Sequence, residues 1–256
     1  METGATLDFA GGTQTVTGNV SGPGTVLVSG ATVDMTGGTY NITGSSTHVT
    51  GGSLTFNSGA TVLSVGPLSL TGGTLTFNSG EAIQPTSLTQ SGGTLTGSDN
   101  LTVSGVTTWT GGTMSGTGTT TANGGLTLSG SNTKTLSRDL TSAGTANISG
   151  TGPLQITSGS LTRTGAFNND GTVDVQAGSS LLMNGGGTST GTFTVVTGSN
   201  IEFGGGTNDL NTGATVTVSG TLLVNGGTVN MNTSSAYRLT GTTLVTGGTL
   251  TALGDL

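Results

Sequence analysis

The stretch GGSLTFNSGATV (residues 51–62) returns 21 residues later as GGTLTFNSGEAI (residues 72–83). In both copies, polar and apolar residues alternate after the double glycine, which is typical of a strand with one buried face. The Asn-Ser-Gly that follows favours a turn, because these residues tolerate the backbone conformations that turns require. Self-similarity at this short period predicts supersecondary units that stack on one another.

The double glycine recurs along the chain at a nearly constant spacing. From Gly51 to Gly111 and again from Gly186 to Gly247, neighbouring copies are 19 to 21 residues apart, and Gly11 lies two periods before Gly51. The copies begin at Gly11, Gly51, Gly72, Gly92, Gly111, Gly186, Gly205, Gly226 and Gly247. Between about 125 and 185 the double glycine is lost although single glycines keep the step, so irregular coils are expected over 125–185.

Each repeat has room for three short strands with turns between them. In one repeat we expect strands at Ser53–Phe56, Thr61–Val65 and Leu68–Leu70, with corners at 57–59 and 66–67. Short strands with glycine corners predict an all-β fold, a single-stranded parallel β-helix (β-solenoid), right-handed, with about 20 residues per coil and roughly 12 coils. A β-sandwich is the alternative, but its short strands come without a 20-residue self-similarity.

The composition supports an ordered all-β chain. Of 256 residues, 51 are Gly and 58 are Thr, both weak helix formers, and charged residues make up only 6%. Disorder is disfavoured because the apolar 30% is regularly placed. The sequence contains no 18-residue apolar run, no signal peptide and no cysteine. The net charge of −7 argues against nucleic acid or an anionic membrane as a partner.

We expect one solenoid domain over residues 1–256, with a column of apolar side chains inside. Leu54, Leu75 and Leu95 should form one row of that column, and Asn57 should stack on Asn78 at a corner. The repeat begins and continues almost to the chain ends, where capping segments would be expected. The chain is therefore expected to be a piece of a longer array, or to associate with itself head to tail.

The sequence offers no constellation for catalysis. Its carboxylates are scattered, and the closest pairs are Asp170 with Asp174 and Glu202 with Asp209, for which we expect turn-capping and solubility roles. Lys134, Arg138 and Asp139 form a mixed-charge cluster that is expected to be a solvated loop. His48 is the sole histidine, which leaves no residues for a Ser-His-Asp triad or a two-His metal site. We therefore expect no enzyme, no catalytic residue, no cofactor and no metal.

One surface feature stands out, a T-x-T pair after most double glycines. Alternation would point both hydroxyls outward and the residue between them inward, so that stacking makes a double file of threonines. The pairs are Thr13/Thr15, Ser53/Thr55, Thr74/Thr76, Thr94/Thr96, Thr113/Ser115, Thr188/Thr190 and Thr249/Thr251. Such files resemble those of β-solenoid ice-binding proteins. Thr is also a natural solvent-side strand residue, and Asn41, Asp209 and Asn230 are expected to interrupt the file.

A broader resemblance covers nearly the whole chain. The segments 171–175, 185–195 (GGGTSTGTFTV) and 213–218 (GATVTV) look like the degenerate repeats of filamentous-haemagglutinin-like proteins and autotransporter passengers, which are secreted bacterial surface β-helices. The resemblance implies an extracellular or cell-surface stalk, fibre or adhesin, no catalysis and no membrane insertion. Its expected partners are a second copy of the chain or a host or cell-surface ligand. Ice binding is the alternative function, and carbohydrate binding or processing, which needs a cleft lined with acids and aromatics, is a third.

Overall fold

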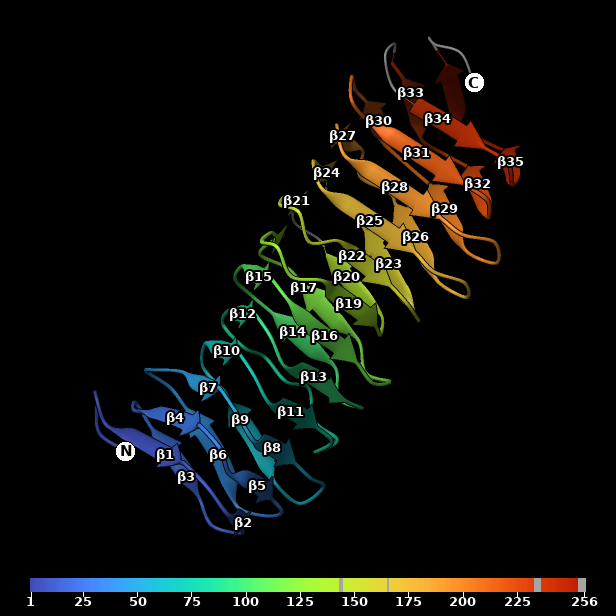
Figure 1. Ribbon diagram of the computed structural model, residues 1–256. Helices are drawn as coiled ribbons and strands as arrows, with labels where there is room; N and C mark the ends of the chain where they lie inside the picture. Colours follow the sequence, from blue (N-terminus) through green and yellow to red (C-terminus); the bar gives the residue numbers. More distant parts are fainter. Residues whose placement is uncertain (143–144, 165, 233–235, 253–256) are drawn as a thin grey trace. The chain divides into compact units, whose positions relative to one another are not determined.

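The computed structural model describes residues 1–142, 145–164, 166–232 and 236–252. The chain divides into two compact units, Met1–Asn123 (unit 1) and Gly124–Leu256 (unit 2). Each unit is a parallel β-solenoid, and together they contain about 12 coils of about 20 residues, which confirms the predicted fold class (Figure 1). Every regular element in the described residues is a strand, so these residues contain no helix that could cross a membrane.

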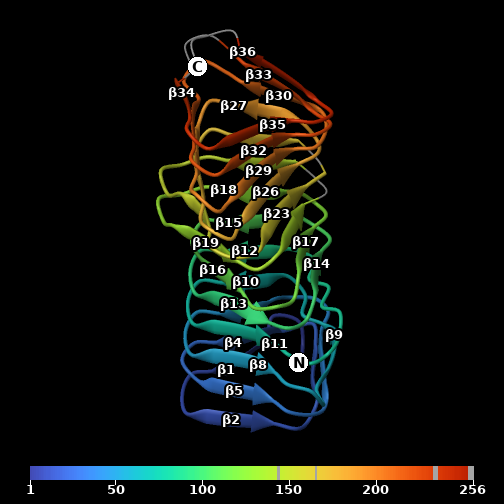
Figure 2. The same ribbon diagram turned by 90° about the vertical axis from the view of Figure 1, so that its right-hand side faces the viewer.

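In unit 1 the strands contribute in turn to a first, a second and a third sheet, with one coil lacking the third strand, and neighbours within a sheet are parallel. The first sheet contains β1 (Thr6–Phe9), β4 (Thr25–Val28), β7 (Thr47–Val49), β10 (Leu68–Leu70), β12 (Leu88–Gln90) and β15 (Thr107–Trp109). The second contains β2 (Thr13–Val16), β5 (Thr32–Met35), β8 (Ser53–Phe56), β11 (Thr74–Phe77), β13 (Thr94–Gly97) and β16 (Gly112–Ser115), and Figure 2 shows β2, β5 and β8 one above another. The third is divided into β3 (Val20–Gly22), β6 (Thr39–Ile42) and β9 (Thr61–Ser64), followed by β14 (Leu101–Val103) and β17 (Thr120–Ala122).

Unit 2 repeats this three-sheet arrangement, including the range 125–185 where the double glycine is missing. Its first sheet contains β18 (Leu126–Leu128), β21 (Ala146–Ile148), β24 (Phe167–Asn169), β27 (Gly187–Ser189), β30 (Thr207–Leu210), β33 (Thr228–Met231) and β36 (Thr249–Ala252). Its second contains β19 (Lys134–Ser137), β22 (Leu154–Ile156), β25 (Thr172–Val175), β28 (Thr192–Val195), β31 (Thr215–Val218) and β34 (Ala236–Leu239). Its third contains β20 (Leu140–Ser142), β23 (Ser160–Arg163), β26 (Ser180–Met183), β29 (Asn200–Phe203), β32 (Thr221–Val224) and β35 (Thr242–Val245).

The interior of each unit is filled by in-register side chains. In unit 1, Leu75 is the backbone partner of both Leu54 and Leu95, and all three are buried, so the predicted row is confirmed. An aromatic row lies beside it: the rings of Phe56 and Phe77 stack with centroids 5.1 Å apart. Such rows form because a constant register places the same strand position of successive coils directly above one another.

The double glycines of unit 1 are explained by the closeness of successive corners. Gly73, Gly93 and Gly112 have φ between +63° and +94°, a region that residues with a Cβ rarely occupy. A Cβ at any of the three would lie only 2.5–2.6 Å from the carbonyl oxygen of the corner glycine in the preceding coil. The repeat therefore requires glycine both for its backbone angle and for the approach of one coil to the next.

The third sheet of unit 1 is interrupted after β9. The register of β9 against β6 shifts at Tyr40/Asn41, and Leu63 is 64% exposed at this irregularity. Of the three strands predicted in this coil, β8 and β10 match their predicted bounds and β9 ends one residue early, at Ser64. The next coil has no third strand among its described residues, only a bridge between Ile83 and Leu101.

The prediction of a solvated loop at residues 134–139 is wrong. Lys134 and Arg138 are buried, and only Asp139 is exposed. Lys134 is in register with the buried Leu154 of the next coil, so its side chain starts from an inward position. Its ammonium group donates to the carbonyl oxygens of Ser129 (3.0 Å) and Asn132 (2.9 Å) at its own corner. The charge of Lys134 suggested an exposed position, but its side chain is buried because the residue occupies an inward position of its strand.

Candidate functional site

The outward side of the second sheet of unit 1 carries two columns of hydroxyl groups, here called the hydroxyl face. Its inward neighbours Val33, Leu54, Leu75, Leu95 and Met114 are buried. The face contains Thr13, Thr15, Thr32, Ser53, Thr55, Thr74, Thr76, Thr94, Thr96, Thr113 and Ser115, with Asp34 at one position of the second column.

Backbone register holds these hydroxyls in line. Thr74 is the partner of Ser53 and Thr94, and Thr76 is the partner of Thr55 and Thr96. Asp34 lies between Thr15 and Thr55 and is the one charged residue in the two columns. The sequence prediction missed Thr32 and Asp34 because no double glycine precedes them, although their strand shows the same alternation.

The predicted pairs of unit 2 lie on another sheet. Thr188 belongs to β27, Thr190 follows it, and Thr249 and Thr251 belong to β36, all of them in the first sheet. The prediction of one file through all seven pairs is therefore wrong. The reason is that the double glycines before the predicted pairs lead into second-sheet strands in unit 1 and into first-sheet strands in unit 2.

The predicted interruptions also fall on different sheets. Asn41 belongs to β6 in the third sheet of unit 1, away from the hydroxyl face. Asp209 and Asn230 do lie in the column with Thr188 and Thr251, since these four residues are successive partners in the first sheet of unit 2.

The second sheet of unit 2 has hydroxyl pairs that the sequence analysis did not select. Two pairs lie on the neighbouring strands β28 and β31, Thr192/Thr194 and Thr215/Thr217, and β25 adds Thr172 in register with Thr192. Their columns are interrupted by the partners Gln155 and Asp174 at one side and by Arg238 at the other. The face with the longest uninterrupted run of hydroxyls is therefore that of unit 1, over four successive coils from Ser53 to Ser115.

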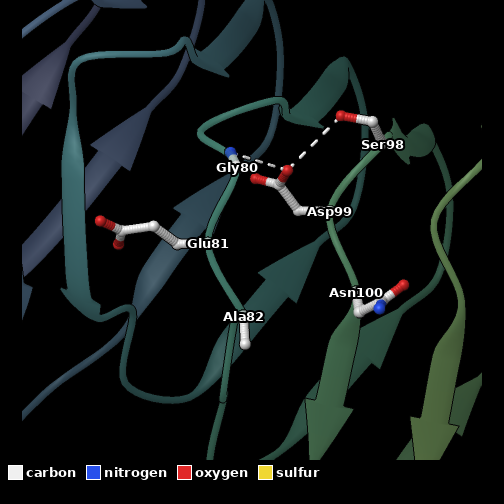
Figure 3. Close-up of a pocket in the computed structure, with 6 residues that line it drawn as sticks. All are labelled: Gly80, Glu81, Ala82, Ser98, Asp99 and Asn100. Carbon is white, nitrogen blue, oxygen red and sulfur yellow. Dashed lines mark hydrogen bonds between the residues drawn. The ribbon is translucent and has the colours of Figure 1, made fainter.

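A pocket of about 290 Å³ lies beside the interruption of the third sheet in unit 1. It is lined by Gly80, Glu81, Ala82, Ser98, Asp99 and Asn100 (Figure 3). Asp99 accepts hydrogen bonds from the backbone N–H groups of Ser79 (2.7 Å) and Gly80 (3.0 Å). Glu81 extends away from Asp99 and accepts a hydrogen bond from the N–H of Val62 at 2.7 Å. The two carboxylates thus satisfy separate backbone donors, and no aromatic side chain lines the pocket.

Most other carboxylates also bind a group one coil away. Among the ten carboxylates of the described residues, seven accept a hydrogen bond from a residue 19 to 23 positions distant in the sequence. They are Asp8, Glu81, Asp99, Asp139, Asp170, Glu202 and Asp209. Asp139 is typical: one oxygen accepts from both the N–H (2.8 Å) and the hydroxyl (2.9 Å) of Ser160. These hydrogen bonds tie successive coils together.

Asparagines use the same geometry. Asn78 accepts from the N–H (2.9 Å) and hydroxyl (3.2 Å) of Ser98, and Asn100 accepts from both groups of Thr119. In unit 2, the side-chain amide of Asn168 donates to Asn147 at 3.1 Å. Asn57 and Asn78 follow the paired Phe56 and Phe77, as predicted, but within the described residues their amides do not hydrogen-bond to each other, because Asn78 engages Ser98. A hydrogen bond between two side-chain amides is found instead at Asn168 and Asn147.

Two groups with shifted pKa values, Tyr40 and Lys134, lie in the interior. Burial raises the pKa of Tyr40, and a hydrogen bond with the Thr47 hydroxyl (2.8 Å) opposes that shift only in part. Burial lowers the pKa of Lys134. His48 faces outward from the first sheet, and its Nε2 is buried without a hydrogen-bond partner. Within the described residues, no group of three or more His, Asp or Glu could hold a metal ion.

Comparison of the chain with protein-family models, with curated proteins and with solved structures finds no match.

Proposed function

We propose that this chain is a non-catalytic structural β-solenoid that forms part of an extracellular stalk, surface fibre or adhesin. The observation that carries the proposal is the use of seven carboxylates as ties between coils. Each of these carboxylates accepts a hydrogen bond from a group one coil away, which gives it a role in holding the coils together. Ties between coils strengthen the interfaces on which a stacked repeat protein depends.

The chain has no cysteine, so its stability must come from sources other than disulfides. A solenoid without disulfides must resist unfolding through ladder hydrogen bonds and burial, and both run through each unit here. The resemblance of the repeats to secreted bacterial β-helices supports placement at a cell surface, where a host or cell-surface ligand would be the partner.

Pulling single molecules of the whole chain between its two ends tests the structural role. A stalk should resist force and then lengthen in steps, because the coils detach one after another. Each coil of about 20 residues should release roughly 70 Å of chain. The variant Asp139→Ala, which lacks a tie to Ser160, should rupture at lower force in unit 2. Smooth extension at low force, without steps, would contradict the proposal.

The proposal includes association of this chain with a second copy. Core-facing residues of the first and last described coils are partly exposed: Leu7 at 36% and Val245 at 50%, whereas their partners Val26 and Val224 are buried. Apolar side chains at open strand edges favour pairing with another chain. Sedimentation should show assembly that grows with concentration and is reduced by Val245→Lys. A monomer at every concentration would refute association.

Ice binding is a second candidate function, favoured by the in-register hydroxyl columns of unit 1. It would use an outward surface that the structural role leaves free.

A further inference from the structure

We propose that the hydroxyl face of unit 1 is the surface through which this chain would contact ice, and that Asp34 limits its extent. This inference rests on the second candidate function, ice binding, and assigns it to one of the three sheets. Its occupant is the surface of an ice crystal together with the layer of ordered water that joins crystal and protein.

The first argument is the regularity of the hydroxyl lattice. In a parallel sheet, neighbouring strands are about 4.8 Å apart, and side chains on one side of a strand repeat about every 6.6 Å. Because Thr74 and Thr76 are in register with their partners in both neighbouring coils, the oxygens follow both repeats at once. Oxygen atoms in hexagonal ice lie in planes with repeats of similar size. A two-dimensional match is required if many weak contacts are to form together.

The second argument is stiffness. Thr is β-branched, so it has few χ1 rotamers, and the backbone beneath it is fixed by ladder hydrogen bonds on both sides. The buried residues between the columns, such as Leu75 and Leu95, hold the strands from the inside. A preorganised surface loses little conformational entropy on binding, which matters because each hydroxyl–water contact is weak.

The third argument is flatness. The corners before β8, β11, β13 and β16 are double glycines, so no side chain rises on that border of the face. A planar crystal surface can therefore approach the columns from this side. The methyl groups of the threonines add small apolar areas between the hydroxyls, and apolar surface restricts the orientations of neighbouring water.

Asp34 is the exception within the face. It occupies the second column between Thr15 and Thr55, so it separates the first coil from the run of hydroxyls that starts at Ser53. A carboxylate orders water around its charge and resists losing that shell, so its hydration does not follow the threonine lattice. Replacing Asp34 with Thr should join the first two coils to the run and enlarge the contact area.

The test measures thermal hysteresis of the purified whole chain and of matched variants. Thr96→Lys places a long charged side chain on the hydroxyl face, whereas Thr89→Lys places it on the first sheet of the same coil, where Thr89 is exposed. We expect the wild type to show hysteresis, Thr96→Lys to lose most of it and Thr89→Lys to retain it. Asp34→Thr should increase it. Circular dichroism checks folding, and Thr76→Lys replaces Thr96→Lys if that variant unfolds.

The outcomes separate the two levels of the proposal. Equal hysteresis in Thr96→Lys and Thr89→Lys overturns the assignment to this face while leaving ice binding in place. An active wild type with no gain in Asp34→Thr overturns the limiting role of Asp34. A folded wild type without hysteresis overturns ice binding itself, and the inference with it.

Discussion

Shortening Leu75 to alanine should reduce the free energy of unfolding of unit 1 by about 3–4 kcal/mol. Leu75 is buried between Leu54 and Leu95, and strand pairing on both sides fixes the distance between these three residues. The missing groups account for roughly 2.4 kcal/mol at about 0.8 kcal/mol for each buried CH₂. The remainder comes from the cavity, which the paired strands cannot close.

The only tryptophan provides the assay. Trp109 is buried in β15 of unit 1, and its Nε1 donates to the carbonyl oxygen of Gly111 at 3.0 Å, so its fluorescence should change when this unit unfolds. In urea, with a slope of about 1–3 kcal/mol per M, the midpoint for Leu75→Ala should fall by roughly 1–4 M. Far-ultraviolet circular dichroism should follow the same transition if the coils unfold together.

The matched control is Leu63→Ala, the same chemical change at an exposed position of β9. Its effect should be within about 0.5 kcal/mol, because little apolar area leaves the interior. Replacing Leu75 with Asp should open the unit, since an unpaired charge would enter the apolar column. Similar midpoints for Leu75→Ala and Leu63→Ala would refute the inward and outward assignment of the strands.

Three further outcomes are expected. Gly73→Ala should destabilise unit 1 more than Gly80→Ala in thermal melts: both have positive φ, which costs about 1–2 kcal/mol, but only at Gly73 would the new Cβ meet backbone within 4 Å. Because the pKa of Tyr40 is raised, above pH 10.0 the unfolded chain loses a proton that the folded chain keeps, and unit 1 should lose stability there. Tyr40→Phe should remove this part of the pH dependence. Trp109 fluorescence in urea measures the stability of both variants. For Lys134 the change of stability with pH has the opposite sign. Between its lowered pKa and 10.5, the unfolded chain holds a proton that the folded chain has lost, so unit 2 should gain stability as the pH rises. Hydrogen exchange at β19 should show this gain in the wild type and not in Lys134→Met.

The local features of the fold follow from the sequence. Alternation predicts which residues of Thr74–Phe77 point inward, and the 21-residue offset from Ser53–Phe56 predicts that Leu75 pairs with Leu54. Both predictions hold because strand periodicity is a property of a few neighbouring residues, and because a constant period leaves one register for the next coil.

The tertiary structure decides how these strands are placed around each coil. A double glycine indicates a tight corner, but the lengths of the strands and loops before it determine which corner that is. Those lengths drift along the chain, so Thr76 and Thr188 follow the same motif and lie on different sheets. Lys134 is buried for the same reason: the phase of β19 directs it inward, and nearby carbonyl oxygens accept its hydrogen bonds despite the cost of burying charge. A sequence motif determines the backbone geometry at its own corner. Whether two motifs lie on the same sheet depends on the total length of the strands and loops between them.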